Sequence, residues 1–223
     1  MNKIFQMSER YRVGLILAVV GGYLDAYTYI CRGKVFANAQ TGNIVLFGIN
    51  LIEKRWESAL EYFTPIMAFV IGVLLSEFFR KKYNKEFLHW RQSILLLEMI
   101  ILIIVAFIPI GDLDILANVL ISFVCSLQVE SFRKFRGKAY ASTMCTGNLR
   151  SASEALYKSL VIKNKEDLKS SMNYFGIITF FIIGGMIGAI ITKKYLEKSV
   201  LFSVIGLMIV FIMMFINYDK EKI

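Results

Sequence analysis

The sequence predicts an all-α polytopic membrane protein with about six transmembrane helices, two short re-entrant half-helices and two inverted structural repeats. Three observations lead to this fold class. Of the 223 residues, 57% are hydrophobic and 19% are charged, against roughly 45–50% apolar residues in soluble domains. The apolar residues form long blocks. The polar triplet Thr-Gly-Asn occurs once in each half, at 41–43 and 146–148.

Six apolar stretches have about the length that crosses a bilayer, which takes roughly 20 helical residues. They are residues 13–30, 62–79, 93–109, 115–130, 172–192 and 200–217. The first follows basic residues as a signal peptide would, but the small residues around Ala37 lie too far beyond it for cleavage. We therefore expect this segment to be retained as a helix.

Two further helices are predicted after the triplets, over 41–52 and 146–162. The first is too short to cross comfortably, and the second carries Arg150 and Glu154 and is amphipathic. Basic residues gather at the N-terminus, in 80–91 and in 131–138, whereas the connection 110–114 is acidic. The positive-inside rule places all three basic regions in the cytoplasm only if both triplet helices dip into the membrane and return. Both termini are then cytoplasmic, although Lys193, Lys194 and Lys198 fall outside.

The two halves resemble each other. Asp25 precedes Thr41 by 16 residues, and Glu130 precedes Thr146 by the same 16. Gly72 corresponds to Gly184, and the Lys-Lys-Tyr after each of them recurs at the same separation. We therefore expect a first repeat over 1–112 and a second over 113–223 within one integral membrane domain. Three crossings per repeat invert the second copy, which is a common plan of transporters.

The triplets are the predicted substrate site. Thr can cap a helix start, Gly allows close approach, and Asn offers both donors and acceptors. A helix that starts inside the membrane directs its positive end at an anion. The predicted binding residues for a small, anionic solute or ion are Thr41, Gly42, Asn43, Thr146, Gly147, Asn148, Asn38 and Gln40. Alternatively, the triplets only cap two half-helices and pack the repeats together.

Acids inside the predicted spans are costly and typically mark ion or proton paths. Asp25 and Glu130 are therefore candidates for ion or proton coupling. Alternatively, they form salt bridges with Arg32 and Arg136 that lock the fold. Glu98 lies nearer a span end and is expected at the membrane interface. We assign helix packing to a set of small residues, namely Gly72, Ser76, Gly184, Gly185 and Gly188.

Other functions find little support in the sequence. The single histidine, His89, and the three cysteines form no metal-binding spacing, and no catalytic motif is present, so we expect neither an enzyme nor a cofactor. The net charge of +9 resides in short connections between apolar blocks, which argues against nucleic acid binding. The lipid bilayer is the expected partner, and a homo-oligomer remains an open alternative.

The stretch from Gly21 to Asn43, with Gly21-Gly22-Tyr23-Leu24-Asp25-Ala26-Tyr27 and Val35-Phe36-Ala37-Asn38-Ala39-Gln40-Thr41-Gly42-Asn43, closely resembles the signature of YoaK-like bacterial membrane proteins. Chain length and the second triplet extend the resemblance over nearly the whole chain. It implies a multi-pass protein of the bacterial cytoplasmic (inner) membrane, often described as permease-like, without a substrate or site residues. The repeats and triplets favour a transporter. The alternatives are a passive channel and a scaffold or sensor without transport.

Overall fold

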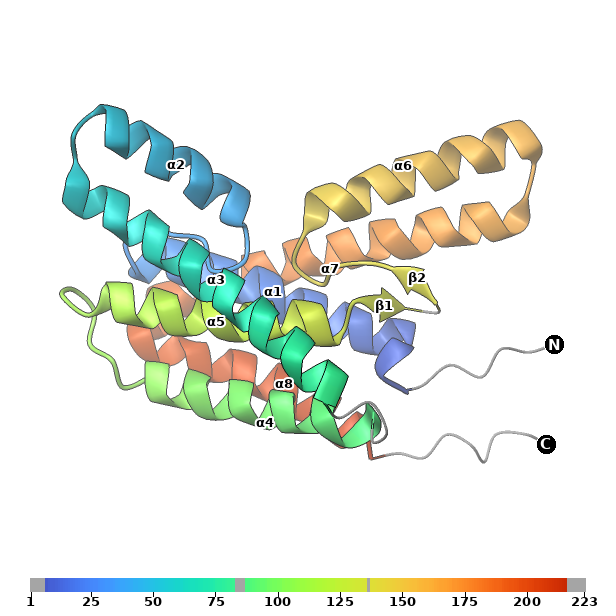
Figure 1. The fold of residues 1–223 in the computed structure, drawn as a ribbon. Helices are drawn as coiled ribbons and strands as arrows, with labels where there is room; N and C mark the ends of the chain where they lie inside the picture. The colour runs from blue at the N-terminus through green and yellow to red at the C-terminus, as the bar shows by residue number, and fades with distance from the viewer. Residues whose placement is uncertain (1–6, 83–86, 136, 216–223) are drawn as a thin grey trace.

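The computed structural model describes residues 7–82, 87–135 and 137–215, which form a bundle of helices (Figure 1). The α-helices are α1 (Tyr11–Cys31), α2 (Gln40–Ile52), α3 (Trp56–Lys82), α4 (Phe87–Val105), α5 (Asp114–Ser131), α6 (Cys145–Ile162), α7 (Lys165–Tyr195) and α8 (Leu201–Met213). Two 3-10 turns, η1 (Met7–Glu9) and η2 (Leu196–Val200), precede α1 and α8. A short antiparallel hairpin, β1 (Lys134–Phe135) and β2 (Lys138–Ala139), lies between α5 and α6; the sequence did not predict it.

Four helices, α1, α4, α5 and α8, enclose the main hydrophobic core. Their apolar side chains interdigitate in one buried cluster, to which these helices contribute, among others, Leu17, Leu24, Leu95, Met99, Ile121, Val124, Leu207 and Val210. Burial of apolar side chains in such a cluster stabilises the fold by about 25 cal/mol per Å² of apolar surface. The core therefore lies along the axis of the bundle, and the remaining helices pack around it.

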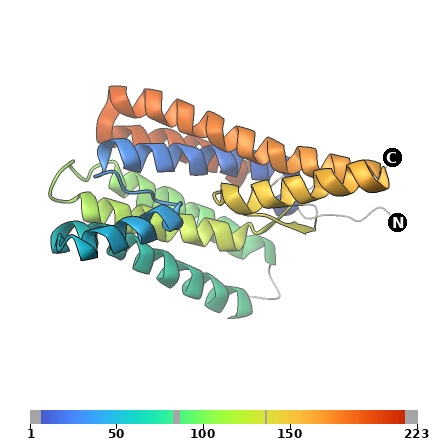
Figure 2. The same ribbon diagram turned by 90° about the horizontal axis from the view of Figure 1, so that it is seen from above.

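The remaining four helices form two hairpins, α2–α3 and α6–α7, which diverge toward opposite ends of the bundle (Figure 1). The helix α3 packs along α5 of the second half, and α7 packs along α1 of the first half. Figure 2 shows α1 lying between α7 and α5. In each half of the chain, the third helix therefore packs against the first helix of the other half.

Glycines allow these two crossings to be close, as the sequence predicted. A side chain on Gly184 of α7 would overlap the backbone of Val19 on α1, and Gly188 approaches Tyr23 in the same way. A side chain on Gly72 of α3 would overlap the Ser126 hydroxyl of α5. Corresponding glycines therefore serve corresponding contacts in the two halves.

Helix ends are set by local backbone and caps. Gly33 and Lys34, with φ of 77° and 62°, take left-handed conformations just after α1, and Lys163 (φ 54°) does so after α6, a common way for a helix to stop. The amide oxygen of Asn164 accepts the N–H of Glu166 at 3.0 Å and starts α7.

Within the described residues, four segments are long and apolar enough to cross a membrane. They are Tyr11–Cys31, Trp56–Lys81, Asp114–Ser131 and Lys165–Met213. The last has 49 residues and runs through α7, η2 and α8, which were predicted as two spans. The predicted span 93–109 overlaps α4, which is not among the four. The predicted span 200–217 is described as far as residue 215.

Candidate functional site

The two Thr-Gly-Asn triplets lie in the first turns of α2 and α6, which begin at Gln40 and Cys145. The predicted capping role of threonine is wrong: the N-cap residues are Ala39 and Met144, and neither helix start has a side-chain cap. Thr41 and Thr146 are instead the second helical residues and their side chains are exposed. The α-helices nevertheless start where the triplets predicted them.

The asparagine of the first triplet holds the loop before its own helix. Its Oδ1 accepts the N–H of Phe36 at 3.1 Å, and its Nδ2 donates to the Phe36 carbonyl at 2.7 Å. The same Nδ2 donates to Oε1 of Gln40 at 2.9 Å. Asn43 has no exposed surface. Its amide is therefore fully engaged with the protein.

The asparagine of the second triplet repeats this arrangement. Nδ2 of Asn148 donates to the carbonyl of Ala141 at 2.7 Å, and its Oδ1 accepts the Ala141 N–H at 3.4 Å. In both halves the partner is the residue seven positions earlier. We call these two arrangements, Asn43 on Phe36 and Asn148 on Ala141, the asparagine clasps.

The loop between α1 and α2 is anchored from three sides. The carboxylate Oδ1 of Asp25 on α1 accepts the N–H of Asn38 at 2.7 Å. The Ala37 carbonyl accepts hydrogen bonds from Ser122 of α5 at 3.0 Å and from Gln40 of α2 at 2.9 Å. Asp25 is therefore buried in the centre of the bundle, and its carboxylate helps to fix the conformation of this loop.

The loop between α5 and α6 reaches the same region. Nε2 of Gln128 donates to the Ser142 hydroxyl at 3.0 Å. Gly21 of α1 leaves room for Thr143 from this loop, because a Cβ there would lie 2.7 Å from the Thr143 methyl group. The carbonyl of Gly21 accepts Nδ2 of Asn38 from the first loop at 3.1 Å. The two loops therefore meet at Gly21.

The structure separates the two predicted coupling acids. Asp25 lies in the centre of the bundle, where its Oδ1 accepts the N–H of Asn38. Glu130 instead lies at the end of α5 beside Arg133, whose Nη1 contacts its carboxylate at 2.8 Å, and Arg80, at 3.4 Å.

The salt bridges predicted as alternatives therefore have other partners. Arg32 pairs with Asp114 and not with Asp25. Glu130 does form ion pairs, and Arg136, its predicted partner, lies outside the described residues.

One acid was missed. Glu98 on α4 was expected at the interface, but it is 1% exposed, and its Oε1 has no hydrogen-bond partner in the described part of the chain. The signal was in the sequence, because Glu98 is the single charged residue in the apolar run from 93 to 111.

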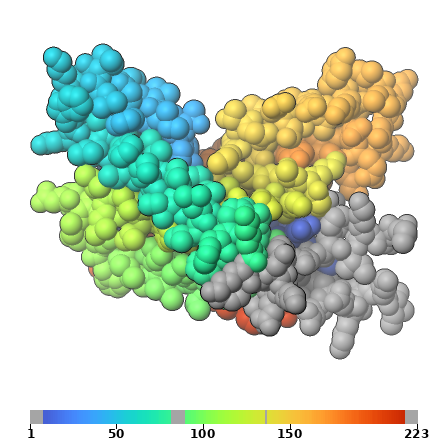
Figure 3. All heavy atoms as spheres, viewed as in Figure 1, coloured from blue at the N-terminus to red at the C-terminus, as the bar shows by residue number. Residues whose placement is uncertain are grey.

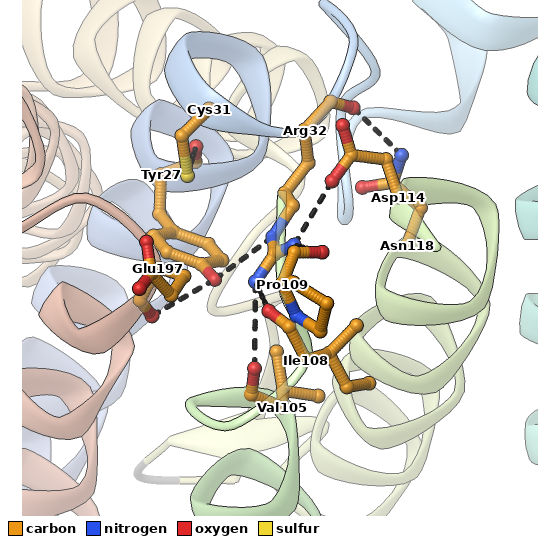
Figure 4. Close-up of polar contacts among 9 residues, drawn as sticks. All are labelled: Tyr27, Cys31, Arg32, Val105, Ile108, Pro109, Asp114, Asn118 and Glu197. Carbon is orange, nitrogen blue, oxygen red and sulfur yellow. Dashed lines mark hydrogen bonds and ion pairs between the residues drawn. The ribbon is translucent and has the colours of Figure 1, made fainter. Parts of the chain in front are cut away.

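A buried arginine, Arg32, fixes the C-terminal end of α1 (Figure 4). Nε of Arg32 donates to the Tyr27 hydroxyl at 3.0 Å, and its Nη1 contacts Asp114 Oδ1 at 2.9 Å. Its remaining hydrogen bonds go to the backbone carbonyls of Val105, Ile108 and Pro109. Burial acts to lower the pKa of Arg32, but Asp114 and Tyr27 more than offset it, and the pKa is raised. This guanidinium joins α1, the end of α4 and the start of α5.

Comparison with known proteins gives a family match and a curated relative. Residues 13–213 match the family described as "Protein of unknown function (DUF1275)". The "UPF0700 transmembrane protein YoaK" of Bacillus subtilis (strain 168) is 26% identical over 187 residues, which cover 78% of this chain and 80% of that protein. No solved structure matches.

Proposed function

Since this chain belongs to the DUF1275 family of unknown function and is an all-α membrane protein, we propose from its geometry that it transports a small solute or ion. The observation that carries this proposal is the placement of α2 and α6. Both begin near the centre of the bundle and run toward opposite ends (Figure 1). Half-helices that start at mid-membrane are a recurrent way to build a transport site.

We further propose that the two halves are inverted repeats. The equal spacing of the asparagine clasps, with each asparagine bound to the residue seven positions earlier, supports it. So does the exchange of α3 and α7 between halves through Gly72 and Gly184. On this proposal α1, α3, α4, α5, α7 and α8 each cross the membrane, and α2 and α6 each reach halfway. Both termini are then cytoplasmic, in the inner membrane.

The solute would bind between the two helix starts. The surface is hollowed between the α2–α3 and α6–α7 hairpins (Figure 3). Thr41, Thr146 and Gly147 are exposed, and a side chain on Gly147 would meet nothing within 4 Å. Because the asparagine amides are engaged in the clasps, and the N–H groups of Gln40 and Gly42 donate to the carbonyls of Asn38 and Ala39, the groups left for the solute are the threonine hydroxyls and the other first-turn N–H groups. The positive ends of both helices favour an anion.

Asp25 remains a proposed proton-coupling residue, and Glu98 takes the place of Glu130 as the second proposed coupling residue. Asp25 and Glu98 are both buried, with 6% and 1% of their surface exposed. Glu130 is compensated by arginines and has 16% of its side chain exposed. An uncompensated acid inside the membrane is a functional candidate, whereas a paired acid at a helix end is adequately explained by structure. The transported anion would accordingly move together with a proton.

A flux assay tests this function. The purified protein is reconstituted into liposomes that contain a pH-sensitive dye, and inward gradients of chloride, nitrate, phosphate, succinate and glutamate are applied in turn. We expect at least one anion to acidify the lumen faster than in protein-free liposomes. Asp25→Asn and Glu98→Gln should remove this acidification. Glu154→Gln, which changes an exposed acid on α6, should leave it intact.

The alternatives give different results. A passive channel would carry the anion without acidifying the lumen, and its flux would not saturate. Absence of flux for every anion, in protein shown to be folded by its thermal unfolding, would overturn anion transport and favour a scaffold or sensor. Acidification that survives in Asp25→Asn would overturn the coupling role of Asp25.

A further inference from the structure

Three exposed lysines gather where α7 ends and the chain turns into α8. Lys193 and Lys194 lie in the last turn of α7, and Lys198 lies in η2. We call this group the lysine turn. Among the described residues, no carboxylate forms an ion pair with it, and the turn itself carries one acid, Glu197. In the arrangement proposed above, these lysines lie on the outer side of the membrane, where the positive-inside rule does not account for them.

An exposed apolar stripe on α7 leads to the lysine turn. Ile183, Ile187 and Ile190 are separated by four and three residues, so they share one helix face, and Lys194 continues that face one turn later. All three isoleucines are exposed, Ile190 to 70%. Figure 2 shows α7 along one edge of the molecule. In a helix long and apolar enough to cross a membrane, such a face is a surface for acyl chains.

A second, independent observation is a pair of aromatic rings at the same turn. The ring centroids of Tyr195 and Phe202 lie 5.6 Å apart, and both side chains are exposed. Nζ of Lys194 lies 5.3 Å from the centroid of the Tyr195 ring. Tyrosines at this level are typical of the boundary between acyl chains and headgroups. The ring attracts the ammonium group but does not neutralise its charge, so Lys194 can still bind an anion.

We propose that the lysine turn binds the headgroup of an anionic phospholipid whose acyl chains lie along the isoleucine stripe of α7. Ammonium groups form charge-assisted hydrogen bonds with phosphate oxygens, and basic clusters at the edge of a membrane helix are a known way to recognise anionic headgroups. A lipid fits better than a free phosphate ion, because the apolar stripe runs directly to the lysines. This inference is independent of the transport proposal.

Native mass spectrometry of the full-length protein tests this proposal. The protein is released from detergent micelles that contain equal amounts of phosphatidylglycerol and phosphatidylcholine with the same acyl chains. We expect the phosphatidylglycerol adduct to dominate. Lys193→Gln/Lys194→Gln/Lys198→Gln should lower the apparent affinity for phosphatidylglycerol on the order of a hundredfold, since each lysine near a membrane surface contributes about fivefold. Lys198→Gln alone, which leaves the last turn of α7 unchanged, should lower it about fivefold.

A matched control separates this site from general charge effects. Lys163→Gln/Lys165→Gln/Lys169→Gln removes three exposed lysines at the turn between α6 and α7, where Glu166 and Asp167 offset their charge, and should bind phosphatidylglycerol as the wild type does. The inference is overturned if the two lipids bind equally or if the control variant loses as much affinity as the lysine-turn variant. A rise in Tm with soluble glycerol 3-phosphate as large as that with phosphatidylglycerol would also overturn it, and would identify a free phosphate site.

Discussion

The loops that precede α2 and α6 are built on one plan, yet they are anchored differently. Both are held by an asparagine clasp to the residue seven positions earlier. In the first half, Asp25 also binds the loop through the Asn38 N–H, deep in the bundle. In the second half, the corresponding Glu130 faces two arginines at the end of α5. The shared clasp thus holds the loop before each of the two helices. The acids differ in position, because Asp25 is buried in the bundle and Glu130 lies at the end of α5.

We expect the largest loss of stability when a buried charge of the first half is removed, in comparison with an exposed charge of the second half. Arg32 is fully buried and Arg133 has 44% of its side chain exposed. Arg32→Met should destabilise the protein by about 3–5 kcal/mol, because it leaves Asp114 and several carbonyls without partners. Arg133→Met should cost about 1 kcal/mol or less. Unfolding in a denaturing detergent series would measure both, and equal losses would refute the contrast.

The next comparison concerns the two close helix crossings. A Cβ at Gly184 would meet backbone atoms of Val19, which cannot move aside, whereas at Gly72 its closest contact is the Ser126 hydroxyl. Gly184→Ala should therefore cost about 3 kcal/mol and Gly72→Ala about 1 kcal/mol. Adding Ser126→Ala should recover part of the Gly72→Ala loss. Failure of that second change to help would mean that the backbone of Phe123, at 2.9 Å, sets the cost.

The asparagine clasps should differ by a smaller amount. Asn43→Ala removes three hydrogen bonds and leaves both backbone groups of Phe36 unpaired. Asn148→Ala removes two, one of them long at 3.4 Å. We expect losses of about 3 and about 2 kcal/mol, since each buried unpaired group costs about 1–3 kcal/mol. The same unfolding series would show it. A negligible loss in either variant would mean that the clasp does not hold its loop.

The smallest expected effect belongs to the acid of the second half. Glu130→Gln should change stability by about 1 kcal/mol or less, because its ion pairs are partly exposed. Asp25→Asn should cost about 2 kcal/mol, since a buried, charge-assisted hydrogen bond to the loop is weakened. Unfolding at two salt concentrations would sharpen the comparison, because only the Glu130 variant should lose its effect at high salt. The reverse order would exchange the roles of the two acids.

Local sequence patterns were enough to predict several features of the candidate site. The triplets predicted the starts of α2 and α6, and the paired glycines predicted close helix crossings, because helix starts and small-residue contacts depend on adjacent residues and fixed spacing. Glu98 was misplaced, since distance from a span end does not reveal which helix face is buried. The partner of Arg32 was also missed, because Asp114 lies 82 residues away in the chain.

By itself, the sequence determined that this protein is helical and resides in a membrane, and where most helices begin, because hydrophobic length and helix-terminating residues act locally. Only the tertiary structure decided that the asparagines clasp their own loops, that Asp25 binds the first loop in the centre of the bundle, and that Glu130 instead pairs with arginines at the end of α5. These are choices among polar partners of similar chemistry. Packing makes them, because a buried polar group bonds to whichever partner the folded chain brings within about 3 Å.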